Sequence, residues 1–242
     1  MNKKFLFYSV FTIFFIFNYI VSSGQEVNKT NEEVKNMVKD IHWLGQSAFK
    51  ITGEKIVYFD PYRLSGKQEK ADIILISHSH SDHCSPEDVK KIQKSNTIIV
   101  APSDCKSKLS GNVETIKPGD KVTIEGINIE AVPAYNVNKK FHPKENNWVG
   151  YIITISGRRI YHCGDTDKIP EMANIKSDVV LIPIGGTYTM IAEEAAEAVN
   201  LMKPKLAIPM HYGSIVGSPG DAVRFKEKCT VPVEILSPES GK

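Results

Sequence analysis

A cluster of histidines directly follows an apolar segment, and this arrangement constrains the fold more than any other feature. Residues 71–77 read ADIILIS, an apolar run typical of a buried strand, and residues 77–84 read SHSHSDHC. The next segment, SPEDVKKIQ, begins a predicted helix, because Ser85 can cap its N-terminus and Pro86 suits the first helical position. The histidines must therefore occupy a strand-to-helix loop, where a rigid scaffold can fix reactive side chains.

This loop carries imidazole and carboxylate groups in the pattern H-x-H-x-D-H. His78 and His80 are two residues apart, so their side chains point the same way in an extended segment. Asp82 and His83 fall where the chain turns and can face a second point close to the first. Imidazole nitrogen and carboxylate oxygen are ligands for zinc and similar divalent ions. The pattern predicts a metal centre rather than a polar surface turn.

Other strand ends supply further candidate ligands. Asp165 follows the run RRIYHCG, where Gly164 lets the backbone turn closely and the carboxylate could bridge two ions. His211 follows the apolar run KLAIPM, and His142 lies in a polar loop between two predicted strands. We predict all three as metal ligands that complete a two-metal centre.

The remaining histidines and the cysteines are predicted to be structural. His42 and His162 lie within strand patterns, and Asp167 is interpreted as a turn or helix-capping residue. The cysteines show no C-x-x-C pairing, which argues against a zinc ribbon or a thioredoxin-type motif. Their wide spacing favours free, buried thiols, with disulfides as the alternative in an exported protein. They are Cys84, Cys105, Cys163 and Cys229.

Short β-rich runs alternate with turns from residue 41 onward. Several are continuously apolar, which is typical of sheets that are buried on both faces. Helices are predicted between some of them, at SPEDVKKIQ and at AEEAAEAVNLM, which ends before Pro204. Strands in two halves, with helices able to cover the outer faces, predict an α/β sandwich.

The first 24 residues have the layout of a secretory signal peptide. Lys3 and Lys4 precede an aromatic-rich apolar run over residues 5–21, and small residues follow. We predict cleavage after Gly24 and export of the protein, with an uncleaved membrane anchor as the alternative. Residues 25–40 are then a polar leader with a short predicted helix, and residues 41–242 form the main domain.

The charge balance argues against a nucleic-acid substrate. The chain has 30 basic and 28 acidic residues, a net charge of +2. Removing residues 1–24 deletes two lysines and no acid, which leaves 28 charges of each sign. A neutral domain lacks the basic surface that binds phosphate backbones. We expect a small-molecule substrate, and the sequence does not indicate an oligomeric state.

The motifs SHSHSDH, YHCGDTD and IPMHYG together resemble the metallo-β-lactamase superfamily over residues 41–218. WLGQSAFKI, YFDPY, PAYN and PIGGTYTM resemble its branch of metal-dependent hydrolases, which includes relatives of ascorbate-phosphate lactonase and N-acylphosphatidylethanolamine phospholipase D. The resemblance implies a four-layer αββα sandwich with two divalent metal ions at one edge between the sheets. Zinc is the expected metal, with manganese or iron as alternatives.

The resemblance also implies a division of the ligands: His78 and His80 on one ion, Asp82, His83 and His211 on the other, and Asp165 bridging both. Two positions depart from the pattern. Gln46 stands where relatives usually have histidine, and Asn136 stands where the third histidine of the first site often lies. His142, six residues later, is the predicted replacement, with a weaker first site as the alternative.

The chemistry of such a centre predicts a hydrolase that acts on an ester, lactone or phosphoester. A zinc ion lowers the pKa of bound water toward about 7, so that a metal-bound hydroxide can attack at neutral pH. Asp82 is predicted to orient this nucleophile, and Tyr188 to assist the oxyanion or leaving group, with loop packing as its alternative role. A catalytically silent binding module with one metal or none, and an iron-dependent oxidoreductase, are the alternative functions. A true β-lactamase is disfavoured, because the branch motifs match elsewhere in the superfamily.

Overall fold

The computed structural model describes residues 32–239 of the 242-residue chain. Contacts divide the chain into two units, Met1–Lys39 and Asp40–Lys242. In the first unit, residues 32–38 are helical, within the predicted leader helix. The predicted signal peptide lies outside the described residues. No helix within residues 32–239 is long and apolar enough to cross a membrane.

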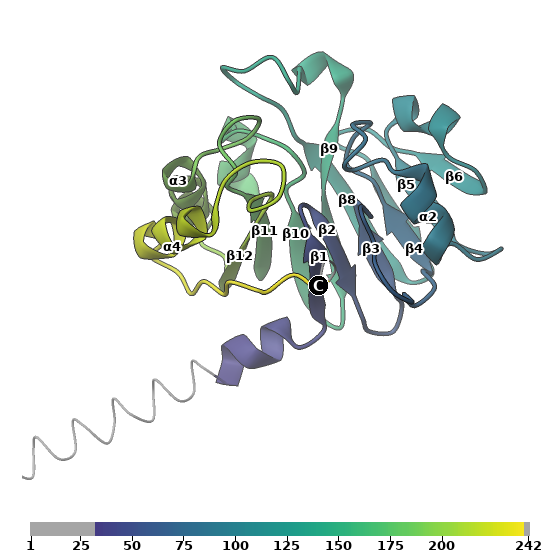
Figure 1. Cartoon of the computed structure of the whole chain (residues 1–242), viewed down its shortest axis with the longest axis horizontal. Coiled ribbons are helices and arrows are strands. Elements are labelled where there is room, and N and C mark those ends of the chain that lie inside the picture. The colour runs from purple at the N-terminus through teal and green to yellow at the C-terminus, as the bar shows by residue number, and fades with distance from the viewer. Residues whose placement is uncertain (1–31, 240–242) are drawn as a thin grey trace, which may run out of the picture. The chain divides into compact units, whose positions relative to one another are not determined.

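Two six-stranded sheets form the body of the second unit (Figure 1). The strand order of the first sheet is β1 (Ile41–Gly45), β2 (Ala48–Ile51), β3 (Val57–Phe59), β4 (Ile73–Leu75), β5 (Ile98–Ala101) and β6 (Asn112–Thr115). The order of the second is β12 (Leu206–Met210), β11 (Val179–Pro183), β10 (Arg158–His162), β9 (Val149–Ile155), β8 (Ile127–Pro133) and β7 (Lys121–Ile124).

Each sheet combines an antiparallel part with a parallel part. Strands β3 to β6 pair in parallel, as do β10 to β12, whereas the other neighbours are antiparallel. Parallel strands are usually buried on both faces, and β4, β11 and β12 are buried along their whole length. The loops that follow the carboxyl ends of β4 and β12 lie together at one edge of the sandwich.

Helices cover the outer faces of the sheets. The described helices of this unit are α2 (Pro86–Ile92), α3 (Ala192–Met202) and α4 (Pro219–Lys228), with short 3₁₀-helices at Ser103–Lys108, Lys144–Asn146 and Pro170–Asn174. Val89 and Ile92 of α2 join the core cluster of the first sheet. Helix α3 contacts β11 and α4 on the second sheet. The predicted four-layer αββα sandwich is confirmed.

The two sheets pack together through buried aromatic residues. Phe59 of β3 stacks on His162 of β10, with ring centroids 4.8 Å apart. Tyr151 of β9 donates its hydroxyl to the carbonyl of Ile76, which follows β4, at 2.9 Å. A tyrosine side chain can be buried in a core when its hydroxyl forms a hydrogen bond, as it does here. His162 also bonds the carbonyl of Ser47 at 2.9 Å, which confirms its structural role.

The local predictions for α2 and the cysteines are confirmed. Ser85 caps α2 by accepting a hydrogen bond from the backbone of Asp88, and Pro86 begins the helix. The four cysteines are free, three of them buried and Cys229 partly exposed. Nδ1 of His42 lies 2.8 Å from Oε1 of Glu239, a contact compatible with a structural role for His42.

Candidate metal centre

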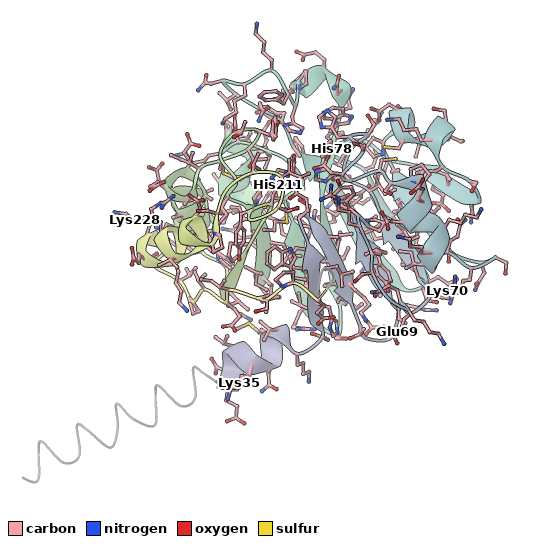
Figure 2. All side chains as sticks on the ribbon, viewed as in Figure 1. Lys35, Glu69, Lys70, His78, His211 and Lys228 are labelled. Atoms are coloured by element: carbon pink, nitrogen blue, oxygen red, sulfur yellow. The ribbon has the colours of Figure 1, made fainter. Side chains whose placement is uncertain are left out.

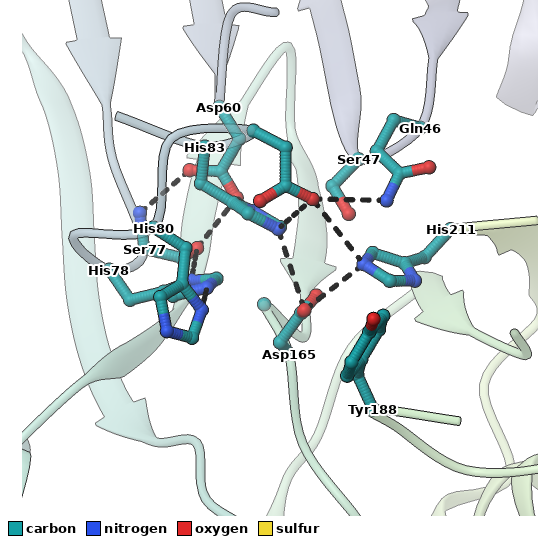
Figure 3. A network of polar contacts seen from close by, with 12 residues as sticks. Gln46, Ser47, Asp60, Ser77, His78, His80, His83, Asp165, Tyr188 and His211 are labelled. Atoms are coloured by element: carbon teal, nitrogen blue, oxygen red, sulfur yellow. Dashed lines mark hydrogen bonds and ion pairs between the residues drawn. The ribbon is translucent and has the colours of Figure 1, made fainter. Parts of the chain in front are cut away.

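Loops at the carboxyl ends of the strands bring all seven predicted ligands together. His78, His80, Asp82 and His83 lie between β4 and α2, and the others follow β8, β10 and β12 (Figures 2 and 3). Figure 2 shows His78 and His211 in one region of the molecule, although they are distant in sequence. The sheets thus assemble side chains from four separate segments.

The ligand atoms form three overlapping groups, and within each group they lie no more than 4.8 Å apart. The groups are His78, His80 and His142; His78, His83 and Asp165; and Asp82, His83 and His211. The first and third match the two ligand sets implied by the family resemblance, with His142 in the place of the missing third histidine.

Asp165 lies between the first and third groups. Its Oδ2 is 3.3 Å from Nε2 of His142. It is also 3.0 Å from Nε2 of His211 and 3.4 Å from Nε2 of His83 (Figure 3). The side chain is 97% buried, so this charge has few water molecules around it. A buried carboxylate needs cations or hydrogen-bond donors as partners, and this position is the one a bridging ligand requires.

Three buried nitrogen and oxygen atoms of the cluster are free to bind a metal ion. Nε2 of His83, Nε2 of His142 and Oδ1 of Asp165 are buried and have no hydrogen-bond partner. Buried polar atoms in folded proteins almost always have one. Divalent ions coordinated by imidazole and carboxylate groups would satisfy all three atoms.

Asp60 fixes the histidine rings from behind. Its carboxylate accepts hydrogen bonds from Nδ1 of His83 at 2.8 Å and from the hydroxyl of Ser77 at 2.6 Å. Because that hydroxyl donates to Asp60, it accepts from Nδ1 of His78 at 2.9 Å. Both rings therefore carry a proton on Nδ1 and turn Nε2 toward the cluster. Nε2 of His78 faces Nδ1 of His80 at 3.0 Å, whereas Nε2 of His83 has no hydrogen-bond partner.

Asn136 holds His142 in a similar way. Its side-chain oxygen accepts from the backbone N–H of His142 at 3.0 Å and faces Nδ1 of the ring at 3.1 Å. The amide nitrogen donates to the carbonyl of Tyr188 at 2.9 Å, which ties the two loops together. Asn136 thus orients the histidine that stands in for the usual ligand, and Nε2 of His142 is left free.

Aromatic and apolar groups surround the first group of ligands. The ring of Trp148 lies 4.9 Å from those of His78 and His80 and 5.6 Å from that of His142, measured between centroids. Its indole nitrogen donates to Asp104 at 2.9 Å, which fixes the ring. This buried ring is an apolar neighbour on one side of the cluster, and a low local dielectric strengthens electrostatic interactions.

The backbone is strained where it enters the site. Gln46, Asp60 and His211 have φ values of 50°, 42° and 58°, a region that residues other than glycine seldom occupy. The backbone N–H of His211 donates to the carbonyl of Gln46 at 2.9 Å, and this hydrogen bond joins two of the three strained positions. A Cβ atom on Gly185 would lie 2.3 Å from the carbonyl oxygen of His211. Only glycine avoids this clash. Strain of this kind is typical of functional sites.

The charges of the cluster favour a bound cation. Burial lowers the pKa of His78 well below its ordinary value, and the charge of His83 adds to this effect. Burial alone would raise the pKa of Asp165, but the charges of His211 and His83 hold it well below its ordinary value. Burial is likewise outweighed at Asp82, where His83 lowers the pKa to about 2. Burial alone would lower the pKa of His83, but the charges of Asp165, Asp60 and Asp82 hold it well above its ordinary value. The two carboxylates are thus already in the charged form that binds metal ions, and a cation would displace the extra proton of His83.

Tyr188 lies beside the cluster in the loop after β11. Figure 3 shows its hydroxyl pointing toward Asp165 and His211. The edge of its ring packs against Phe141, with centroids 4.7 Å apart and planes at 90°. The backbone carbonyl of Tyr188 accepts the hydrogen bond from the side-chain amide of Asn136. The predicted catalytic and packing roles are both compatible with this position.

Sequence reasoning missed Asp60, Ser77 and Trp148 as parts of the site. Asp60 ends the run KIVYFD just as Asp165 ends RRIYHCGD, and a carboxylate directly after an apolar strand was the available signal. The role of Trp148 has no such signal, because its contact with the histidines depends on how β9 packs.

Residues 40–211 match a family model described as the β-lactamase superfamily domain. Curated relatives carry the name UPF0173 metal-dependent hydrolase. One from Thermoplasma acidophilum is 37% identical and covers 84% of this chain and 96% of its own. Another from Thermococcus kodakarensis is 35% identical and covers 85% and 98%. The chain belongs to this hydrolase family. Within the superfamily, its branch is that of the UPF0173 hydrolases.

Solved structures agree with the fold of this UPF0173 hydrolase. A Parabacteroides distasonis protein described as a metal-dependent hydrolase is 35% identical, covers 81% of this chain and 91% of its own, and has a TM-score of 0.73. Igni18, a metallo hydrolase from Ignicoccus hospitalis, is 26% identical with a TM-score of 0.69, and covers 82% and 94%. The predicted superfamily and enzyme class are confirmed.

Proposed function

We propose that this UPF0173 hydrolase uses two zinc ions to hydrolyse an ester, lactone or phosphoester. His78, His80 and His142 would hold the first ion, Asp82, His83 and His211 the second, and Asp165 would bridge them. The observation that carries this proposal is the convergence of ligand atoms from four segments on the two sides of Asp165, with Nε2 of His83 and Nε2 of His142 buried and without a hydrogen-bond partner.

The protein's own residues have distinct tasks in such a reaction. A divalent ion, when bound, lowers the pKa of water and polarises a substrate oxygen. Asp60, directly and through the hydroxyl of Ser77, holds a proton on Nδ1 of His83 and His78, so that Nε2 of each ring faces the cluster. Asp82 is the partly exposed carboxylate of the centre, with 20% of its side chain accessible, and can orient an attacking water molecule. The hydroxyl of Tyr188 can donate a hydrogen bond to the developing oxyanion.

The metal content tests the proposal directly. Protein purified without chelators should contain about two divalent ions per chain by elemental analysis, and chelation should abolish turnover of chromogenic ester, lactone or phosphodiester substrates. His80→Ala should lower kcat at least about 100-fold, because several kcal/mol of charge stabilisation depend on the metal centre. His42→Ala is the matched control and should keep both metal and activity. One ion or fewer per chain, with no turnover, would instead support the silent binding module.

A second prediction concerns the replacement of the usual third histidine. Asn136→Ala removes the acceptor that orients His142 and should weaken the first ion about 10- to 100-fold, because partners of metal ligands have effects of that size. Asn136→Asp keeps the acceptor for His142 but loses the donor to the carbonyl of Tyr188, so it should restore only part of the affinity. A two-step competition titration with a chromogenic chelator measures both ions. Equal affinity in all three proteins would contradict a role for Asn136 in positioning His142 at the first site.

A further inference from the structure

A cavity of about 490 Å³ lies beside the metal centre. Its walls are mainly apolar and come from five segments: residues 43–46, the loop after β3, the loop after β12, the first residue of α4, and residues 235–238. Trp43 of β1 stacks on Tyr212, with ring centroids 5.1 Å apart, and forms one wall with it. Ile235 and Leu236 contribute further apolar surface. A cavity of this size and lining is suited to part of a small organic molecule.

The side chain of Gln46 connects this cavity to the metal centre. Gln46 lines the cavity and also donates a hydrogen bond from Nε2 to Oδ2 of Asp82 at 3.1 Å. A carboxylate only accepts hydrogen bonds, so the amide nitrogen must face Asp82 and Oε1 must face away from it. In Figure 3 the oxygen of Gln46 points away from the cluster, and this buried atom has no partner. Tyr212 directly follows the ligand His211, which places a second wall of the cavity next to the centre.

A positive charge lies at the same cavity. Arg63 is exposed, and its guanidinium group lies 5.1 Å from the ring centroid of Tyr62, which also lines the cavity. Within residues 32–239 it forms no ion pair with a carboxylate. The backbone N–H groups of Arg63 and Leu64 both donate to Asp88 of α2, at 2.9 Å each, so the backbone at this arginine is fixed.

We propose that this cavity binds an apolar arm of the substrate and that Arg63 binds a carboxylate at the end of that arm. The substrate class is then an ester or lactone of an aliphatic or aromatic acid that carries a second, free carboxylate. Arginine suits this role because its planar guanidinium group binds carboxylates through paired hydrogen bonds. The reaction assigned to this substrate rests on the proposed hydrolase function, whereas the binding of the arm does not.

Binding to metal-free protein tests the cavity without catalysis. Equilibrium dialysis of the metal-stripped full chain should show that octanoate binds about 5- to 10-fold more tightly than neutral octanamide, a modest ratio because Arg63 is exposed. Arg63→Ala should remove this preference and leave octanamide unaffected. Leu236→Ala should weaken both ligands, since it removes apolar wall. Lys67→Ala, which changes an exposed cation outside the cavity, should alter neither. Equal binding of the two ligands, an unchanged preference in Arg63→Ala, or no binding of either would overturn the proposal.

Activity of the metal-loaded enzyme separates this inference from the proposed function. The 4-nitrophenyl monoester of suberic acid and 4-nitrophenyl octanoate have acyl chains of equal length and differ in the terminal carboxylate. The monoester should have an about 10-fold higher kcat/KM, and Arg63→Ala should abolish the difference. Hydrolysis of both esters at equal rates would contradict the carboxylate site while leaving the hydrolase intact. Octanoate binding without hydrolysis of either ester would support the cavity and count against ester hydrolysis.

Discussion

Asp165→Asn is expected to abolish hydrolysis and to lower the metal content from about two ions per chain to fewer than one. The asparagine side chain has the same shape but no charge, and Asp165 is the carboxylate that faces His142, His83 and His211 together. Without it, the first ion would have no carboxylate ligand and the second would keep only that of Asp82 in this buried position. We expect kcat/KM to fall at least about 1000-fold, because the metal-dependent stabilisation of the transition state is lost.

The matched control for this variant is Asp178→Asn. Asp178 precedes β11 and pairs with Lys205, at the opposite end of the strands from the cluster. It should retain both ions and full activity. Elemental analysis and steady-state kinetics measure the two effects, and circular dichroism checks that both variants fold. An Asp165→Asn protein that binds two ions with wild-type affinity would refute the bridging role.

Asp60→Ala is expected to lower the free energy of unfolding by about 3–5 kcal/mol and to impair metal binding. The change removes the acceptor of three buried donors: the N–H of Ser77, the hydroxyl of Ser77 and Nδ1 of His83. A buried donor without a partner costs about 1–3 kcal/mol, and breaking a buried charged network costs about 3–5 kcal/mol. Urea unfolding of the metal-free protein measures the loss of stability separately from metal binding.

Asp60→Asn separates the stability effect from the effect on the ligands. Asparagine tolerates the φ value of 42° at this position and keeps one acceptor, so a smaller loss of about 1–2 kcal/mol is expected. Its amide nitrogen, however, can face Nδ1 of His83 and favour the tautomer with the proton on Nε2. Metal affinity should then fall about 10- to 100-fold in a protein that remains folded. Full metal affinity in Asp60→Asn would show that the carboxylate does not control the tautomer.

Local patterns explain why part of the site could be predicted. The strand before His78 and the helix after Ser85 are fixed by nearby residues, so the position of the histidine loop follows from a short stretch of sequence. Asp165 and His211 were also identifiable, because each directly follows an apolar strand. Contacts made across longer distances were not identifiable in this way. The bonds between Asp60 and His83 and between Asn136 and the Tyr188 loop depend on the folded arrangement of the strand ends.

The sequence by itself determined the fold class, the histidine loop and the identity of the candidate ligands, because these features depend on apolar periodicity, helix capping and residue chemistry along the chain. The tertiary structure decided how the ligands are grouped, since His142 reaches His78 and His80 only through the folded loop that Asn136 holds. It also decided the position of the apolar cavity, whose walls come from segments near both ends of the described chain. Such contacts depend on how the two sheets pack against each other, which no short stretch of sequence encodes.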